Sequence, residues 1–264
     1  MLPRVVLLTK PYPLAAVLES RIAATGCLVG VVHEQKPGGV ASARKEIRRL
    51  ITRLGLLRAL DVLAYQAYQR VFRAGALRRL FAGLASTATP VAVPRSAFAS
   101  LNSAEARAAI RALEPDLLLV HGTGILKPET FQLAPLAVNL HCGVLPEYRG
   151  HDSTFWALHA GDYDRVGASL HVIDAGVDTG TLIAEGRVAC GPADSDLDAW
   201  VAAFAVGVDL AVTLVERLAD GAPVTFQSPR GKPGKHYGRK GLSDYMSFAL
   251  RRRQAAGRVL RPAS

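Results

Sequence analysis

The chain has 264 residues and a formal net charge of +10, with half of its residues apolar and 20% charged. This composition excludes a wholly disordered chain, and no uncharged run reaches the roughly eighteen residues that a membrane span needs. The length suits one large α/β domain with or without a small appendage, and we expect a soluble protein.

The N-terminal run has the length of a strand and lacks the long apolar region and cleavage site of a secretory signal, so we expect no export. Cys27, Cys142 and Cys190 lie far apart and show no CxxC spacing. That pattern is typical of a reducing compartment and of a protein without structural zinc. We therefore expect a cytoplasmic protein with no metal.

The positive charge is concentrated in two segments. Residues 44–79 contain ten basic and two acidic residues, and residues 251–264 contain five arginines and no acid. The rest of the chain has a net charge of −3. An excess of basic residues is typical of proteins with nucleic acid, anionic membrane or phosphorylated partners. Here it belongs to two separate segments, whereas the body of the chain is near neutral.

The first predicted elements form a β-α-β unit. Residues 4–9 are a short apolar run before two prolines and predict a buried strand. Residues 14–25 have helical spacing, and residues 27–33 are rich in β-branched side chains, which favours the second strand.

A basic helical insertion is predicted next, over about residues 40–82. Its apolar side chains recur at i, i+3, i+4 and i+7 as Ile47, Leu50, Ile51 and Leu54. Most of the basic residues lie on the other side of the same helix, which makes the helix amphipathic. Gly55 ends this amphipathic helix, and one or two further helices follow over residues 56–80.

The alternation of strands and helices resumes after a connector at residues 85–96. Ser103 caps a predicted helix, and the later elements are the strand 116–120, a short helix opened by Pro128, the strand 137–140, the helix 153–159, the paired strands 168–173 and 182–188, and a helix to about residue 218 capped by Asp194 or Ser195. The pattern predicts an α/β fold with a doubly wound, mostly parallel sheet. We expect a main domain over residues 1–190, with residues 191–264 forming a helix and a loop-rich basic extension packed on the same domain.

Common α/β motifs are absent from the sequence. No GxGxxG follows the first strand, which disfavours dinucleotide binding. The sequence also contains no GxxxxGK[ST] and no GxSxG, which disfavours ATP hydrolysis and a serine nucleophile elbow.

Three polar residues suit acyl transfer to an amine. Asn139 and His141 are two residues apart at a predicted strand end, so their side chains point to one side, at the edge where open α/β sheets bind ligands. Asp178 follows on a glycine-flanked loop that can approach them. An amide, an imidazole and a carboxylate can polarise a carbonyl, move a proton and set a tautomer. Singly, each residue also fits a structural role, and His171 in its predicted strand favours packing over catalysis.

Four ordered motifs resemble those of the folate-dependent formyltransferases, which include methionyl-tRNA, glycinamide ribonucleotide and sugar N-formyltransferases. They are Asn139-Leu-His141, the LPEYRG loop within residues 144–150, the DAGVDTG loop of residues 174–180, and the upstream loop of residues 122–128. The resemblance covers roughly residues 114–190. It implies a Rossmann-like formyltransferase fold with a catalytic domain over residues 1–190.

The resemblance implies 10-formyltetrahydrofolate as the formyl donor. Asn139 would hold the formyl oxygen, His141 would move the amine's proton, and Asp178 would orient or charge-stabilise His141. The pterin would lie between two loops, bound by Thr123, Gly124, Ile125, Leu126, Asp174, Ala175 and Val177. The acceptor would contact the intervening loop through Leu145, Pro146, Tyr148, Arg149 and Gly150. No metal is implied.

Two features depart from the family pattern. Cys142-Gly143 replaces the Ala or Pro and then Ser that often follow the histidine, and the insertion at about residues 40–82 has no counterpart in the resemblance. A thiol nucleophile at Cys142 is disfavoured, because adjacent strand residues point to opposite faces.

We expect a small amine acceptor, namely an amino sugar on a nucleotide or a lipid carrier. A basic cluster suited to pyrophosphate supports this choice: Arg230, Lys232, Lys235, His236, Tyr237, Arg239 and Lys240. Methionyl-tRNA is less favoured, because the family's tRNA enzymes carry a C-terminal β-barrel and only roughly seventy residues follow Cys190. A formyltetrahydrofolate hydrolase, contact of residues 44–79 with an anionic membrane, and a homodimer stay open.

Overall fold

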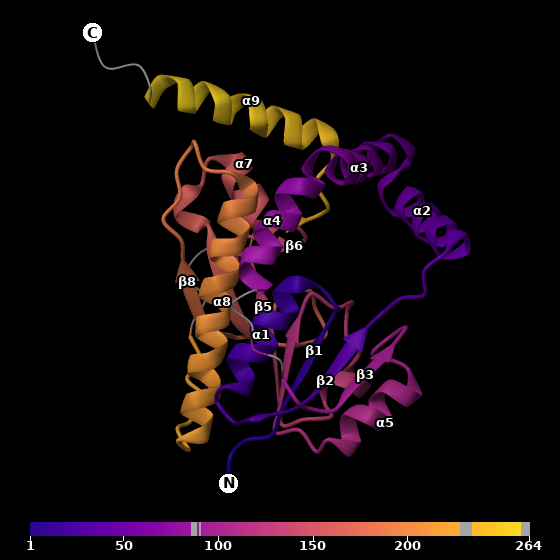
Figure 1. The fold of residues 1–264 in the computed structure, drawn as a ribbon, viewed down its shortest axis with the longest axis vertical. Helices are drawn as coiled ribbons and strands as arrows, with labels where there is room; N and C mark the ends of the chain where they lie inside the picture. The colour runs from indigo at the N-terminus through magenta and orange to yellow at the C-terminus, as the bar shows by residue number, and fades with distance from the viewer. Residues whose placement is uncertain (86–88, 90, 228–233, 260–264) are drawn as a thin grey trace.

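A seven-stranded mixed sheet runs through the molecule (Figure 1). The structure is a computed structural model and describes residues 1–85, 89, 91–227 and 234–259. The strand order is β3-β2-β1-β4-β5-β7-β8. The strands are β1 (Val5–Thr9), β2 (Leu28–Glu34), β3 (Arg95–Phe98), β4 (Leu117–His121), β5 (Leu136–His141), β7 (Gly167–Val172) and β8 (Leu182–Arg187). The first five pair in parallel, and β7 and β8 join antiparallel. The predicted α/β, mostly parallel sheet is confirmed.

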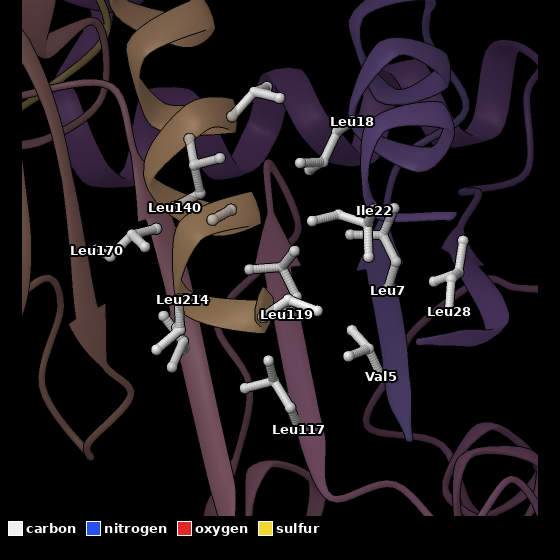
Figure 2. Close-up of a cluster of buried hydrophobic side chains, with 14 of the residues drawn as sticks. Val5, Leu7, Leu18, Ile22, Leu28, Leu117, Leu119, Leu140, Leu170 and Leu214 are labelled. Atoms are coloured by element: carbon white, nitrogen blue, oxygen red, sulfur yellow. The ribbon is translucent and has the colours of Figure 1, made fainter. Parts of the chain in front are cut away.

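One face of the sheet is covered by α1 (Pro13–Ala23) and the long α8 (Asp196–Ala219). Figure 2 shows side chains of both helices meeting those of β1, β4, β5 and β7 in one buried cluster. Of the described helices, α8 alone is long and apolar enough to cross a membrane by length and composition. Its packed side chains, such as Phe204 and Val208, account for that apolarity, because they form part of the core.

The other face of the sheet packs against α5 (Ala104–Ala112). Alternate strand residues, Val6 and Leu8 of β1 among them, point to this face and contact Ile110. Ser103 caps α5 as predicted, since its side chain accepts a hydrogen bond from the Ala106 N–H. Two short helices lie between β4 and β7 in the sequence, namely α6 (Pro128–Phe131) and α7 (Ser153–Ala160).

The predicted insertion is helical throughout its described length. It contains α2 (Val40–Leu54), α3 (Leu56–Tyr68), a π-helical turn η1 (Gln69–Arg73) and α4 (Ala74–Ala85). Gly55 separates α2 from α3 with a φ of 78°. Figure 1 shows α2 and α3 at the opposite end of the molecule from α5.

A buried ion network attaches the insertion to the core. Arg73 of η1 donates two hydrogen bonds to the Asp196 carboxylate, at 3.1 and 2.7 Å, and Lys240 donates a third at 3.0 Å. All three side chains are buried. Tyr65 of α3 adds its hydroxyl, which accepts from Arg73 at 2.9 Å. The network joins three segments that are far apart in the sequence.

Three features differ from the sequence prediction. The connector at residues 85–96 ends in an edge strand, β3, whose half-exposed residues gave no apolar run. The C-terminal segment expected to be loop-rich forms the helix α9 (Leu242–Val259), which lies beside α3 in Figure 1. Two very short strands, β6 (Arg149–Gly150) and β9 (His236–Tyr237), also form a separate pair. The predicted boundary at residue 190 stays a prediction.

Candidate active site

A cavity of about 690 Å³ opens at the carboxyl ends of β4 and β5. Asn139 and His141 reach it from β5, and Asp178 reaches it from the loop after β7. This is the edge of an open α/β sheet at which ligands bind. The structure thus brings together the three residues that the sequence singled out for chemistry.

Asn139 connects two other groups of the site. Its Nδ2 lies 3.0 Å from Nε2 of His171 and donates to Asp178 Oδ1 at 3.3 Å. His171 stands opposite Asn139 on the antiparallel neighbour β7. The other ring nitrogen of His171 lies 2.9 Å from the Val172 carbonyl, which can only accept, so Nδ1 carries the proton and Nε2 accepts from the amide.

His141 presents its unprotonated nitrogen to Asp178. Its Nε2 lies 2.8 Å from the Tyr148 carbonyl and therefore carries the proton of the neutral ring. Its Nδ1 lies 3.7 Å from Asp178 Oδ2. Burial lowers the pKa of His141 below its usual value, although the carboxylate of Asp178 opposes this shift. The ring is therefore neutral at neutral pH and can accept a proton at Nδ1.

Asp178 is held ionised. Burial alone would raise the pKa of its carboxyl, but the adjacent His171 and His141 and the Gly150 N–H, which donates at 2.8 Å, together lower that pKa well below its usual range. The residue adopts a φ of 52°, in the left-handed region that aspartate tolerates better than most side chains. A charged carboxylate thus faces both histidines.

Burial makes two neighbouring groups inert. It raises the pKa of the Cys142 thiol to about 12 and lowers the pKa of His121 to about 4. Cys142 is therefore a neutral thiol at physiological pH and a poor nucleophile. In the described part of the chain, no group of three or more His, Cys, Asp and Glu residues is arranged to hold a metal ion.

The loop over residues 123–126 lines the cavity with all four of its predicted folate-binding residues: Thr123, Gly124, Ile125 and Leu126. Two side chains brace this loop. Glu34 accepts a hydrogen bond from the Gly124 N–H at 2.8 Å, and Asn102 donates to the Ile125 carbonyl at 2.9 Å. The loop is therefore fixed by contacts that the sequence motif alone did not reveal.

The second predicted folate loop lines the cavity through Asp174 and Val177, whereas Ala175 is absent from the lining residues described. The Asp174 carboxylate accepts hydrogen bonds from the Gly176 N–H at 3.0 Å and from the Thr179 hydroxyl at 2.8 Å. A Cβ at Gly180 would lie 1.7 Å from the Val172 carbonyl oxygen. Only glycine fits there, so this contact holds the loop close to β7.

Of the five residues predicted to contact the acceptor, Gly150 lines the cavity. The other four are not among the residues described as lining it: Leu145, Pro146, Tyr148 and Arg149. The Leu145 N–H donates to Ser169, the Tyr148 hydroxyl donates to Asp162, and Arg149 donates to the Gly234 carbonyl at 2.6 Å. These contacts shape the loop, and the contact of the five residues with an acceptor stays a prediction.

Five of the seven residues of the predicted basic cluster lie within the described part of the chain, and they take different places there. Arg230 and Lys232 lie outside the described residues. Tyr237 is stacked between Tyr148 and Trp156, with ring centroids 5.4 and 5.5 Å away, so its faces are occupied by protein. Lys235 and His236 are absent from the described cavity lining.

Two members of the cluster do line the cavity, Arg239 and Lys240. Lys240 is paired with buried Asp196 and holds the network together. Arg239 lies 3.6 Å from Glu46 of α2 and is partly exposed. Together with Lys10, which also lines the cavity, Arg239 is a cation that an acidic ligand can reach.

Two contributions to the site were missed in the sequence. His171 appeared to be a packing residue, and only its cross-strand register with Asn139 reveals its contact with the site. Gln69 and Leu77 of the insertion line the cavity as well. No motif marks them, because they reach the site only through the tertiary placement of η1 and α4.

The fold is that of an α/β protein with a mostly parallel sheet, and one cavity at the sheet edge brings together an asparagine, a histidine and an aspartate. The family model described as formyl transferase matches residues 68–203, just over half of the chain. The chain belongs to this family, and its fold is that of a formyltransferase.

Curated relatives include the methionyl-tRNA formyltransferase of Burkholderia vietnamiensis, which is 35% identical over 158 residues, or 56% of this chain and 48% of that protein. The enzyme of the same name from Aromatoleum aromaticum is 32% identical over 144 residues, or 52% of this chain and 45% of that protein. The chain therefore spans about half the length of the curated relatives it matches.

Similar solved structures include a sugar N-formyltransferase from a Shewanella species, with a TM-score of 0.55 and 12% identity over 95% of this chain and 87% of that chain. Glycinamide ribonucleotide transformylase 1 from Symbiobacterium toebii has a TM-score of 0.56 and 17% identity over 83% of this chain and 89% of that chain. At these identities the likeness shows the fold alone.

Proposed function

We propose that the protein transfers a formyl group from 10-formyltetrahydrofolate to the primary amine of a small acceptor. The observation that carries the proposal is the convergence of Asn139, His141 and Asp178 at one cavity, with His141 neutral and Asp178 ionised. An amide donor, a base and a fixed carboxylate are the groups that transfer of an acyl group to an amine needs.

The described cavity supports this choice of donor. Its volume of about 690 Å³ lies within the range typical of small-molecule sites. The two loops proposed to hold the pterin, residues 123–126 and 173–177, both reach the cavity that Asn139 and His141 line. When bound, 10-formyltetrahydrofolate supplies a formyl group activated for transfer.

His141 is proposed to act as the base. Its Nε2–H is held by the Tyr148 carbonyl, so Nδ1 keeps its lone pair and can take the proton of the attacking amine. The imidazolium formed then lies beside the Asp178 carboxylate, at 3.7 Å, whose opposite charge stabilises it.

Asn139 is proposed to hold the formyl oxygen. Its Nδ2 already donates to Asp178 and His171, so a formyl oxygen bound at this amide replaces one of these acceptors. An N–H donor placed at the carbonyl oxygen stabilises the negative charge that develops there as the amine attacks. His171 is proposed as a positioning residue that fixes the amide through its Nε2.

An amino sugar on a nucleotide or a lipid carrier is the proposed acceptor. Lys10 and Arg239 support this choice, because both line the cavity and neither is fully buried. Cations at the edge of a cavity suit the phosphate groups that both carriers contain. The cytoplasmic location stays a prediction.

Methionyl-tRNA is the second candidate acceptor. The names of the curated relatives favour it, as does the cation-rich insertion. Hydrolysis of the formyl donor uses the same three residues with water in place of the amine and is tested in the same assay.

The full chain is incubated with 10-formyltetrahydrofolate and, in turn, amino-sugar nucleotides, lipid-linked amino sugars, methionyl-tRNA or no acceptor. Tetrahydrofolate release is followed by absorbance and the acceptor by mass spectrometry. We expect formylation of a small amine, with release of tetrahydrofolate strongly reduced in Asn139→Ala and His141→Ala. If a formylated product forms only with methionyl-tRNA, then tRNA is the acceptor and the proposed small amine is wrong. If tetrahydrofolate is released without any acceptor, the protein is a hydrolase. Undiminished turnover by both variants would overturn the assigned site.

A further inference from the structure

We propose that the helical insertion binds an anionic lipid surface through an apolar stripe on α3 and the adjoining η1 and through a cationic face on α2. The apolar stripe consists of Leu57, Leu60, Ala64, Ala67 and Val71. The cationic face consists of Lys45, Arg48, Arg49 and Arg53. Neither feature takes part in the proposed formyl transfer, and vesicle binding tests the proposal without any enzyme assay.

The outward side of α3 is apolar, unlike that of most surface helices. Ala59, Val62 and Tyr65 are buried against the protein. Since each residue turns the helix by about 100°, the stripe lies on the opposite side. Leu57 is 83% exposed and Val71 is 71% exposed.

The exposure continues beyond the stripe itself, since the adjacent Phe72 is 73% exposed. A contiguous exposed apolar surface of this kind marks an interaction site. The burial pattern of α3 therefore points to a partner on its outer side.

The cations of α2 have no ionic partner within the described residues. Lys45, Arg48, Arg49 and Arg53 recur at helical spacing, and no ion pair of the described chain includes them. The acid of this helix, Glu46, instead pairs with Arg239 at the cavity. Long basic side chains beside an apolar surface are the composition of helices that lie in the headgroup region of anionic membranes.

A second copy of the chain fits this surface less well. A two-fold contact through the stripe would bring identical surfaces together. The stripe has the cationic face of α2 at one end and the exposed Arg70, Arg78 and Arg79 at the other. Cations would therefore face cations whichever way the helices pair. Nucleic acid would engage the cations but leave the apolar stripe in water, whereas an anionic bilayer uses both.

The insertion that carries the stripe and the cationic face also contributes residues to the cavity. Gln69, which lies between the stripe residues Ala67 and Val71, and Leu77, which follows the stripe in sequence, line the cavity. The segment proposed to touch the membrane thus also forms part of the cavity wall. An amine carried on a membrane lipid would then reach the site from the membrane side, a consequence that rests on the proposed function.

The test is flotation of the full chain with vesicles of phosphatidylcholine alone or mixed with phosphatidylglycerol. We expect binding to the mixed vesicles, weakened by added salt, and about tenfold or greater loss in Arg49→Glu and in Leu57→Gln/Leu60→Gln. The matched control is Arg111→Glu, an equal charge change at an exposed position of α5. It should bind like the wild type.

All substituted side chains are exposed, and thermal unfolding checks that the variants fold. The proposal is overturned by any of three results: no binding to the mixed vesicles, equal loss in all variants including the control, or a dimer in sedimentation that Leu57→Gln/Leu60→Gln dissolves. The proposal is supported if Arg49→Glu and Leu57→Gln/Leu60→Gln both lose vesicle binding while the folded control, Arg111→Glu, still binds. Formyl transfer to a soluble acceptor, measured in parallel, separates failure of docking from failure of the proposed function.

Discussion

Asp196, the first residue of α8, is the carboxylate partner of two buried cations, Arg73 and Lys240. Replacing Asp196 therefore measures how much this ion network contributes to the free energy of unfolding. In Asp196→Asn, the hydrogen bonds from Arg73 at 3.1 and 2.7 Å and from Lys240 at 3.0 Å lose their charged acceptor. Removing one member of a buried ion group costs about 3–5 kcal/mol, because the remaining charges stay buried without a partner. We expect the free energy of unfolding to fall by that amount.

Arg73→Met provides the matched comparison. Here Lys240 keeps its carboxylate partner, and the lost interactions are two hydrogen bonds to Asp196 and one to the Tyr65 hydroxyl, so we expect a smaller loss of about 2 kcal/mol. Arg73 also lies over the Tyr245 ring, at 4.7 Å, and methionine retains part of that packing. We expect Asp196→Asn to be the less stable variant, because it leaves two buried cations without a carboxylate, whereas Arg73→Met leaves one cation paired with one carboxylate.

The stabilisation by Asp196 should depend on pH. Burial would raise the pKa of its carboxyl, but Lys240 and Arg73 outweigh burial and lower that pKa below the usual 3.8. A carboxyl with a lowered pKa in the folded state stabilises the protein above its unfolded pKa and loses that contribution as pH falls through the folded value. Urea unfolding at neutral and acidic pH measures the difference between wild type and Asp196→Asn. A loss below about 1 kcal/mol at pH 7, or a difference that grows on acidification, would refute the reasoning.

Three further predictions concern the site. Asn139→Ala should lower kcat by about 10²–10³-fold with little change in the unfolding temperature, since it removes one donor to the formyl oxygen; a smaller fall in steady-state kinetics would exclude that role. Because burial lowers the pKa of His141, the acidic limb of the kcat/KM profile should lie below the usual 6.5, and Asp178→Asn should move it lower still, since the carboxylate opposes the shift. A limb that moves upward would contradict the proposed pairing. Gly180→Ala should destabilise the loop, since its Cβ would lie 1.7 Å from the Val172 oxygen, and weaker folate binding by calorimetry would show this.

Much of the fold follows from local patterns in the chain. Fully buried strands such as β1 and β4 are uninterrupted apolar runs, and α2 shows its amphipathic period directly. The edge strand β3 and the helix α9 escaped prediction for a common reason: few of their residues are buried, so hydrophobic patterning is weak. In α9, the run of arginines at residues 251–253 obscured a helix that packs through Phe248.

The sequence by itself determined that Asn139 and His141 lie together at one edge of the sheet, because they share a strand and period-two geometry points both side chains to one side. It also determined that the charge lies mainly on an insertion and a C-terminal segment rather than on the body. The tertiary structure decided which neighbours join them. His171 lies opposite Asn139 because β5 and β7 pair in antiparallel register. Gln69 lines the cavity from the same short helix as Arg73, which donates hydrogen bonds to Asp196, 123 residues away. Such contacts depend on charge balance and packing between distant segments, which no local spacing records.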